Sequence, residues 1–515
     1  MDKFNKKKNQ KGFVLMLVTA TMFMVVPTVG LAIDASFLYA VKARLSAATD
    51  AAALAAARSL AKGQTLSEQA AEAEARARAF FDANFPDYYM LTDNKEVDVT
   101  ISQSGYRTRI VQVDSSVNAS LFFMRLLGDQ YKNVRVSGTA SRRDVNLMMV
   151  LDRSGSMDNS GSCEPMKAAA RQFVDQFANG RDQIGLITFG MTYYNAFPPS
   201  YDFKPALDNV LAAIDCSGGT GTAQALSIAR QQIEAIDEPG ALNVIVFFTD
   251  GLPNGITARF PLKKRSDTRY GYGDDGYNST YYTYNMEPST CRDAQGDRYD
   301  RRYYHSSRRY YAPNWNPYWN PPATADGAMA GTGNGTASTG YTFGVTAREA
   351  SSLTEHNETG LSMSGCRFSG SGWWRVRRDI AYIPDTDYYG NSIYGYESLS
   401  SYKFTSGQYA GKVRPDRPRI IGRVSKNTAD NVARDIRRDT RLSTVIYAIG
   451  LGDPTDPNSL DQDFLRRVAN DPTSPVYNDG SMIDETTGLY VFAPDKTQLS
   501  IAFARVASEI LRITR

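Results

Sequence analysis

VNLMMVLDRSGS, residues 145–156, decides the fold of this chain. The apolar run from Val145 to Leu151 favours a strand that is covered on both faces. The turn after it, D-x-S-x-S, gathers the carboxylate of Asp152 and the hydroxyls of Ser154 and Ser156. These are hard oxygen ligands, which suit Mg²⁺, Mn²⁺ or Ca²⁺ and suit zinc poorly. A pattern of five residues is not specific by itself, so the segments around it decide whether it indicates a metal site.

Two further segments follow in a matching order. Gly218-Gly219-Thr220-Gly221-Thr222 opens an amphipathic helix, and the strand 244–248 runs into Thr249-Asp250-Gly251. With the first turn, these segments resemble the metal-ion-dependent adhesion site of von Willebrand factor A domains. The resemblance implies that a divalent cation, first of all Mg²⁺ and alternatively Mn²⁺ or Ca²⁺, is held directly or through water by Asp152, Ser154, Ser156, Thr220 and Asp250. It also implies that an acidic residue of a partner completes the coordination. The alternative is a strand-to-helix turn whose Ser and Asp only cap backbone groups.

The rest of this region predicts the matching α/β architecture. Pro165 suits the first turn of a helix whose apolar positions repeat at a 3–4 spacing. Further strands are expected at 184–189, 242–248, 443–450 and 489–492, and further helices at 207–214, 223–236, 427–437, 464–468 and 495–513. Strands that alternate with helices predict a doubly wound parallel sheet. Ligands of such sheets bind beyond the carboxyl ends of the strands, where both Asp152 and Asp250 fall.

The N-terminus predicts a membrane anchor. Five lysines, at positions 3, 6, 7, 8 and 11, precede residues 12–33, which carry no charge. As a helix this run is about 33 Å long, enough to cross a bilayer. The lysines predict that residues 1–11 are cytoplasmic and that the chain beyond Asp34 lies outside, as a single-pass protein of the bacterial inner membrane. One alternative is a cleaved secretory signal ending near Gly30-Leu31-Ala32. Lys11-Gly12-Phe13 also resembles a prepilin cleavage site, but Leu17 stands where type IV pilins carry Glu.

The segment after the anchor, 34–84, is rich in alanine. Residues 45–57, LSAATDAAALAAA, resemble the signature of TadE/TadG-like proteins of the Flp (tight adherence) pilus machinery. Because alanine is the best helix former, the anchor helix should continue to about Ala61. Thr65 and Glu68 form a capping box, which predicts a second helix over 66–84.

A small β-rich region is expected over 85–143. Alternating apolar residues follow one another there, with a helical piece predicted at 120–127. The A domain then covers 144–515.

An insertion over 254–418 interrupts the A domain and shows no helix periodicity. It holds 20 of the 31 Tyr, all four Trp and both His, amid Gly, Asn, Ser and Arg. Disordered linkers normally lack aromatic residues, whereas binding loops are rich in them. Because the insertion leaves the chain just after Asp250, we expect it to take part in binding; the alternative is a decoration that packs only on itself.

Four cysteines, an even number, fit an exported protein. In the A-domain fold, the loops that carry Cys163 and Cys216 both border the metal site, and Cys291 and Cys366 both lie in the insertion. The favoured pairs are therefore Cys163–Cys216 and Cys291–Cys366, among three connectivities that four cysteines allow.

Composition argues against several function classes. The net charge of +3 gives no reason to expect nucleic-acid binding. No G-x-S-x-G, H-E-x-x-H or P-loop pattern occurs, so we expect no enzyme. Two interpretations remain. One is a membrane-anchored component of a Flp-type pilus system that binds another pilus or envelope protein, or a surface, through the metal. The other is an envelope scaffold or assembly module that uses the A domain without an adhesive role.

Overall fold

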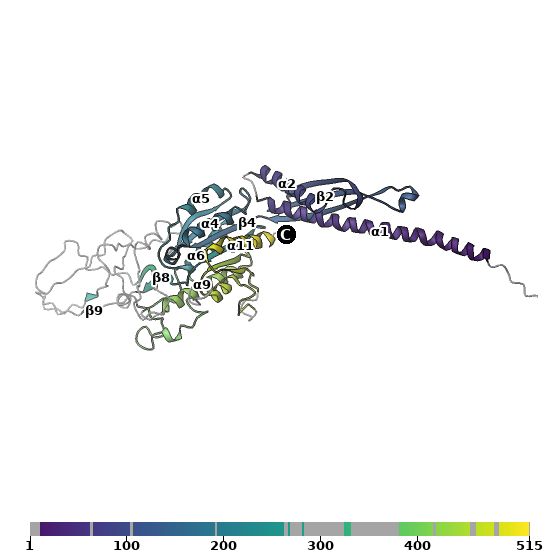
Figure 1. Cartoon of the computed structure of the whole chain (residues 1–515). Helices are drawn as coiled ribbons and strands as arrows, with labels where there is room; N and C mark the ends of the chain where they lie inside the picture. Colours follow the sequence, from purple (N-terminus) through teal and green to yellow (C-terminus); the bar gives the residue numbers. More distant parts are fainter. Residues whose placement is uncertain are drawn as a thin grey trace, which may run out of the picture. The chain divides into compact units, whose positions relative to one another are not determined.

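The chain divides into two compact units, shown in the computed structural model of Figure 1. The N-terminal unit is Met1–Asp144 with Leu511–Arg515, and the C-terminal unit is Val145–Ile510. The residues that the structure describes are 11–61, 65–103, 107–190, 193–261, 266–267, 281–282, 324–330, 381–415, 419–453, 460–477 and 484–513.

Two helices begin the N-terminal unit. Helix α1, Lys11–Ser59, runs unbroken through Pro27 and through the alanine-rich segment, as predicted. By length and composition its part from Leu15 onward is able to cross a membrane, and among the described residues it is alone in this. Helix α2, Leu66–Asn84, has the predicted bounds, because Thr65 accepts a hydrogen bond from the Glu68 N–H and the Glu68 side chain reaches back to Thr65.

A three-stranded antiparallel sheet in the order β1-β2-β3 packs beside these helices. Its strands are β1, Thr92–Gln103, β2, Thr108–Ser120, and β3, Tyr131–Arg143, and a short 3₁₀ turn, η1, Tyr89–Leu91, precedes them. The predicted helical piece at 120–127 is reduced to one 3₁₀ turn, η2, Met124–Leu127, because β2 continues to Ser120. Alanines of α1 and α2 are buried against valines of β2, so small side chains let the helices approach the sheet closely.

A six-stranded sheet in the order β13-β12-β7-β4-β5-β6 forms the centre of the C-terminal unit. The strands are β4, Val145–Asp152, β5, Gln183–Phe189, β6, Tyr193–Ser200, β7, Leu242–Thr249, β12, Val445–Leu451, and β13, Leu489–Ala493. The first five in this spatial order pair in parallel, as predicted for the A domain. β6 pairs antiparallel to β5 and forms one edge.

Helices cover both faces of this sheet. One face carries α4, Cys163–Val174, α5, Lys204–Ala212, and α11, Leu499–Ile513, which follows the 3₁₀ turn η4, Lys496–Gln498. The other carries α6, Thr222–Ile236, α9, Ile420–Arg438, and α10, Gln462–Ala469. The apolar residues of β4 and β7 alternate between the two clusters, which explains why both strands are mainly apolar on both faces.

Part of the predicted insertion packs on α9. Strand β8, Gly255–Pro261, pairs with β11, Thr324–Ala330; two-residue strands β9, Ser266–Asp267, and β10, Tyr281–Tyr282, also pair. Residues 381–415 contain turns, isolated bridges and one 3₁₀ turn, η3, Ser400–Tyr402. Ile383, Ile393 and Leu399 of this stretch bury their side chains against β8 and the first turns of α9. The described part of the insertion therefore shares a small core with the rest of this unit.

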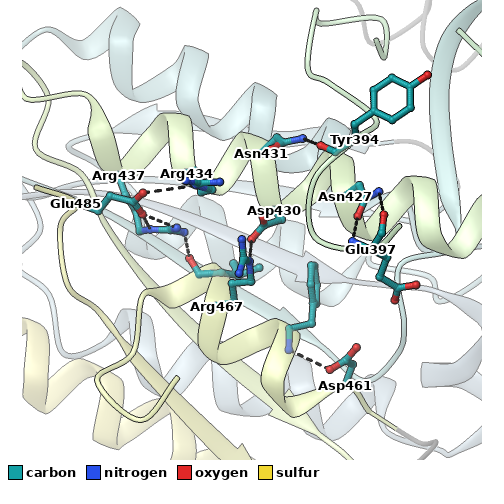
Figure 2. A network of polar contacts seen from close by, with 12 residues as sticks. Tyr394, Glu397, Asn427, Asp430, Asn431, Arg434, Arg437, Asp461, Arg467 and Glu485 are labelled. Atoms are coloured by element: carbon teal, nitrogen blue, oxygen red, sulfur yellow. Dashed lines mark hydrogen bonds and ion pairs between the residues drawn. The ribbon is translucent and has the colours of Figure 1, made fainter. Parts of the chain in front are cut away.

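Two asparagines of α9 hold this stretch by its backbone, as Figure 2 shows. Asn427 donates to the carbonyls of Ile393 and Glu397, both at 2.9 Å. Asn431 donates to the carbonyls of Ser392 and Tyr394 at 2.8 and 2.7 Å. These amides take the place of a strand partner for a loop without regular pairing.

A buried charge network joins α9 to the chain that follows α10 (Figure 2). The Arg437 side chain, fully buried, donates to Glu485 at 2.7 and 3.0 Å and to the carbonyl of Val468 at 2.6 Å. Arg438 pairs with the other oxygen of Glu485 at 2.9 Å. Asp461 caps the N-terminus of α10 by accepting from the Phe464 N–H at 3.0 Å. The network fixes α9 and α10 on one face of the sheet.

Candidate metal centre

The five predicted oxygen residues meet where the winding of the sheet reverses. From β4 the chain passes to β5 on one side, and later to β7 on the other side of β4. Loops that leave the ends of β4 and β7 therefore diverge and open a crevice between them. Asp152 is the last residue of β4, and Asp250 directly follows β7.

Backbone hydrogen bonds lock the surrounding loops together. Arg153 donates its N–H to the carbonyl of Phe189 at 2.8 Å, and Ser217 donates to the carbonyl of Arg153 at 2.6 Å. Gly155 donates to the carbonyl of Gly218 at 2.9 Å, and a Cβ on Gly155 would lie 3.4 Å from that oxygen. These bonds fix the backbone of the loops that carry Ser154, Ser156 and Thr220.

A continuous chain of polar contacts links four of the predicted residues. The Ser154 N–H donates to Asp152 Oδ1 at 2.7 Å, and the Ser154 and Ser156 hydroxyls lie 2.9 Å apart. Ser156 Oγ donates to Asp250 Oδ1 at 2.6 Å. The fifth residue, Thr220, is buried, and a Cβ on Gly251 would lie 3.8 Å from its hydroxyl and 3.5 Å from that of Ser156. The structure thus brings all five side chains to one place.

Two residues with supporting contacts were not predicted from the sequence. Thr249 Oγ1 donates to Asp152 Oδ2 at 2.5 Å, and Asn254 Oδ1 accepts from the Thr220 N–H at 2.7 Å. Asn254 also donates its own N–H to the Thr220 carbonyl at 3.0 Å. Their only sequence signal is position, because Thr249 precedes Asp250 and Asn254 ends the same turn.

The two carboxylates make an electrostatically demanding pair. Burial raises the pKa of Asp152 to about 6, against hydrogen bonds from Ser154 and Thr249 that lower it. Burial, together with the negative charge of Asp152, raises the pKa of Asp250 to about 7. A positive charge between the two groups would offset both effects, because it favours the ionised forms.

The chemistry of the donor set fits a hard divalent cation. Two carboxylates and three hydroxyls offer only oxygen, as a hard cation prefers. Within the described part of the chain, no group of three or more His, Cys, Asp and Glu side chains is placed to hold a metal. Such a site would therefore depend on neutral hydroxyls for most of its ligands.

A disulfide braces the same loops. Cys163 begins α4 and Cys216 precedes the Gly218 turn; they are bonded, with Cα atoms 6.2 Å apart and 53 residues apart in sequence. This confirms the first predicted pair. The second predicted pair, Cys291–Cys366, lies outside the described residues.

Comparisons with known proteins give two family matches. Residues 147–252 match the model of the von Willebrand factor type A domain, and residues 12–59 match that of putative Flp pilus-assembly TadE/G-like proteins. A mouse (Mus musculus) calcium-activated chloride channel regulator 3A-1 is 33% identical over 131 residues, which cover 24% of this chain and 14% of that protein. The chain thus spans about one seventh of the length of this relative.

Solved structures with similar folds were also found. The von Willebrand factor domain of the type V pili tip protein Mfa5 from Porphyromonas gingivalis is 14% identical, with a TM-score of 0.35, covering 73% of this chain and 97% of that one. The PilB minor pilin from Streptococcus sanguinis is 11% identical, with a TM-score of 0.32, covering 83% and 80%. Scores this low carry no argument about function. The two family matches are specific to their segments: the chain joins a TadE/G-like N-terminal segment to a von Willebrand factor type A domain.

Proposed function

We propose that this protein is a membrane-anchored, extracytoplasmic component of a Flp-type pilus system whose A domain binds a partner through a divalent cation. The match of residues 12–59 to TadE/G-like pilus-assembly proteins supports the system and the anchor. The convergence of two carboxylates and three hydroxyls at the ends of β4 and β7 supports the cation, and this observation carries the proposal.

Asp152, Ser154, Ser156, Thr220 and Asp250 would hold the ion, preferably Mg²⁺. When bound, the ion supplies a positive charge that two carboxylates do not fully neutralise in its immediate surroundings, and so it favours an anionic ligand from outside. Asp152, Ser154 and Thr220 are buried, whereas Ser156 is exposed and Asp250 is half-buried. A partner carboxylate therefore approaches from the side of Ser156 and Asp250.

The cation proposal is tested by titrating Mg²⁺ and Mn²⁺ into the full chain in detergent, by calorimetry. Asp152→Asn removes the buried charge with little change in shape, so binding should be lost. Asp158→Asn is the matched control, because Asp158 is an exposed carboxylate of the neighbouring helix α3, Gly155–Asn159, and should change nothing. Wild-type protein that takes up neither ion, or an Asp152→Asn variant that binds as well as wild type, would refute the site.

The pilus role is tested in cells that carry Asp250→Ala. We expect normal numbers of pili by electron microscopy and a loss of adherence. Loss of the pili themselves would instead favour the assembly or scaffold role. Unchanged pili together with unchanged adherence would contradict both roles for the site.

A further inference from the structure

The loop between β2 and β3 has an unusual composition for a hairpin connection. Residues 121–128 read LFFMRLLG, whereas such loops are usually built from Gly, Asn, Asp, Pro and Ser. The structure leaves the Phe122 side chain 47% exposed. It is a large exposed apolar side chain in a loop whose sequence is mainly apolar.

Asp34 of α1 fixes this loop by its backbone. Its carboxylate accepts from the N–H groups of Phe122 at 2.9 Å, Phe123 at 3.0 Å and Met124 at 2.8 Å. The Phe123 ring lies so close to Gly30 that a Cβ there would come within 2.6 Å of it. Phe122 meets Phe37 edge to face, with ring centroids 5.1 Å apart. The loop is therefore clamped to α1 between residues 30 and 37.

This clamp lies at a defined depth along α1. Gly30 precedes the end of the uncharged run, Ile33, by three residues, which corresponds to about 4.5 Å of helix. The whole run is about 33 Å long, close to the ~30 Å hydrocarbon core of a bilayer. A helix that spans the membrane with this run places Gly30, and the Phe123 ring upon it, at the outer edge of the hydrocarbon.

Burial along α1 agrees with that depth. Every residue from 15 to 29 is exposed, and Gly30 is the first buried one in the described part of the helix. The burial of α1 by the rest of this unit thus begins at Gly30, where the loop 121–128 contacts the helix. Phe122 meets Phe37 on the same helix, and the one charged residue of α1 between residue 29 and Phe37 is Asp34, which is buried.

The charges near the clamp suit a membrane surface. Asp34 is buried, and its carboxylate accepts hydrogen bonds from three backbone N–H groups, so its charge is shielded from lipid. The next charge along α1 is Lys42, and Tyr39, between them, is 77% exposed, as residues of an interfacial aromatic belt are. Arg125 of the loop is exposed and able to reach phosphate groups while its stem stays in apolar surroundings.

We propose that residues 121–128 insert into the outer leaflet beside α1, with Phe122 among phospholipid acyl chains and Asp34 as the residue that positions the loop. This proposal rests on the membrane anchor proposed above. A lipid partner fits better than a protein, because the loop continues the exposed apolar surface of a helix whose length matches the bilayer.

The test places the photoreactive residue p-benzoylphenylalanine at position 122 of the full chain, in phospholipid vesicles. After irradiation, mass spectrometry of the peptide should show a phospholipid adduct. Phe80 on α2 is the matched control, being 45% exposed in the same unit, and the same substitution there should give at least tenfold less adduct. A cross-linked dimer, or a yield at position 122 no higher than at position 80, would overturn the proposal.

Two further measurements separate the possible failures. Carbonate extraction of the vesicles reports the anchor: a chain that washes off refutes the proposed membrane protein, whereas a retained chain without adduct at position 122 refutes only the inserted loop. In Asp34→Ala the three N–H groups lose their acceptor, so the adduct yield at position 122 should fall several-fold. An unchanged yield would overturn the positioning role given to Asp34.

Discussion

Thr249 is buried and contacts Asp152, the most buried of the five oxygen residues. Its hydroxyl donates to Asp152 Oδ2, the carboxylate oxygen that Ser154 N–H does not use. In Thr249→Val the shape is kept and the donor is lost. Because a hydrogen bond to a charged group contributes about 1.5–3 kcal/mol, we expect Mg²⁺ affinity to fall by about tenfold or more, measured by calorimetry at pH 7.5.

Thr249→Ser supplies the control for this prediction. It keeps the hydroxyl and removes only a methyl group, so its affinity should stay near that of wild type. Equal affinities in the Val and Ser variants would mean that the contact with Asp152 does not support cation binding.

The raised pKa values of the two carboxylates predict how stability changes with pH. In the unfolded chain an Asp titrates near pH 3.9, whereas Asp152 and Asp250 hold their protons to about pH 6 and 7 in the folded, metal-free protein. The folded state therefore binds more protons than the unfolded state between about pH 4 and 7, and stability is lost as the pH rises through this window.

This effect is isolated by comparing Asp250→Asn with wild type by thermal unfolding in EDTA. We expect the variant to gain several degrees in Tm relative to wild type between pH 5 and pH 8, because it removes one of two like charges. Added Mg²⁺ should reverse the order at pH 8 and have little effect at pH 5, where protons compete with the ion. A difference in Tm between the two proteins that does not change with pH would contradict the coupled pair.

At the same scale, sequence alone located the candidate site but not its support. Asp152, Ser154, Ser156, Thr220 and Asp250 were predictable because each stands in a short pattern at the end of an apolar strand or the start of a helix. Thr249 and Asn254 act through hydrogen bonds to Asp152 and Thr220, which are distant in sequence, and many Thr and Asn residues could make such bonds equally well.

At the scale of elements, the spacing of apolar residues predicted the buried strands and the helices. It did not predict β6, a strand at the edge of the six-stranded sheet. β6 was missed because it contains Pro198 and Pro199, which argue against a strand, yet an edge strand tolerates them. Helix α9 begins seven residues before the predicted start, at Ile420, and its first turns pack against the insertion instead of the sheet. Residues 381–415 depend on Asn427 and Asn431 of α9 for their backbone partners, and no local pattern announces such contacts.

The buried pair between Arg437 and Glu485 predicts a strong dependence of α9 on one carboxylate. Both side chains are fully buried, and Glu485 accepts two hydrogen bonds from the Arg437 guanidinium. Glu485→Gln leaves a buried guanidinium without its counter-charge. Since removal of one partner of a buried pair costs about 3–5 kcal/mol, we expect a loss of about 3 kcal/mol in the unfolding free energy.

Urea unfolding followed by far-UV circular dichroism measures this loss, because unfolding removes the helical signal to which α9 contributes. Asp435→Asn is the matched control: Asp435 is an exposed carboxylate of the same helix, and its substitution should change stability by less than about 0.5 kcal/mol. Equal midpoints for the two variants would show that Glu485 contributes no more than a surface charge.

At the scale of the whole molecule, the two units were predicted from different kinds of sequence feature. Alanine content and a capping box predicted α1 and α2, and apolar runs that end in Asp predicted the central strands of the A domain. The predicted pair Cys291–Cys366 and most of the insertion lie outside the described residues. The orientation of the proposed membrane anchor, by contrast, is expected to depend on charges at the N-terminus.

Topology is the property that the N-terminal lysines should control. Lys3, Lys6, Lys7, Lys8 and Lys11 precede the uncharged run, and positive charge is retained on the cytoplasmic side. The Cys163–Cys216 disulfide reports the orientation, because the bond forms outside the cytoplasm, whereas inside the cytoplasm both thiols stay reduced.

In wild-type cells we expect mass spectrometry of non-reduced peptides to find this disulfide in all copies of the chain. Changing all five lysines to Gln should leave a fraction of chains with both thiols free, whereas changing them to Arg should not. Free Cys163 and Cys216 in wild-type cells would rule out the exported orientation, and full oxidation in the Gln variant would show that these lysines do not set it.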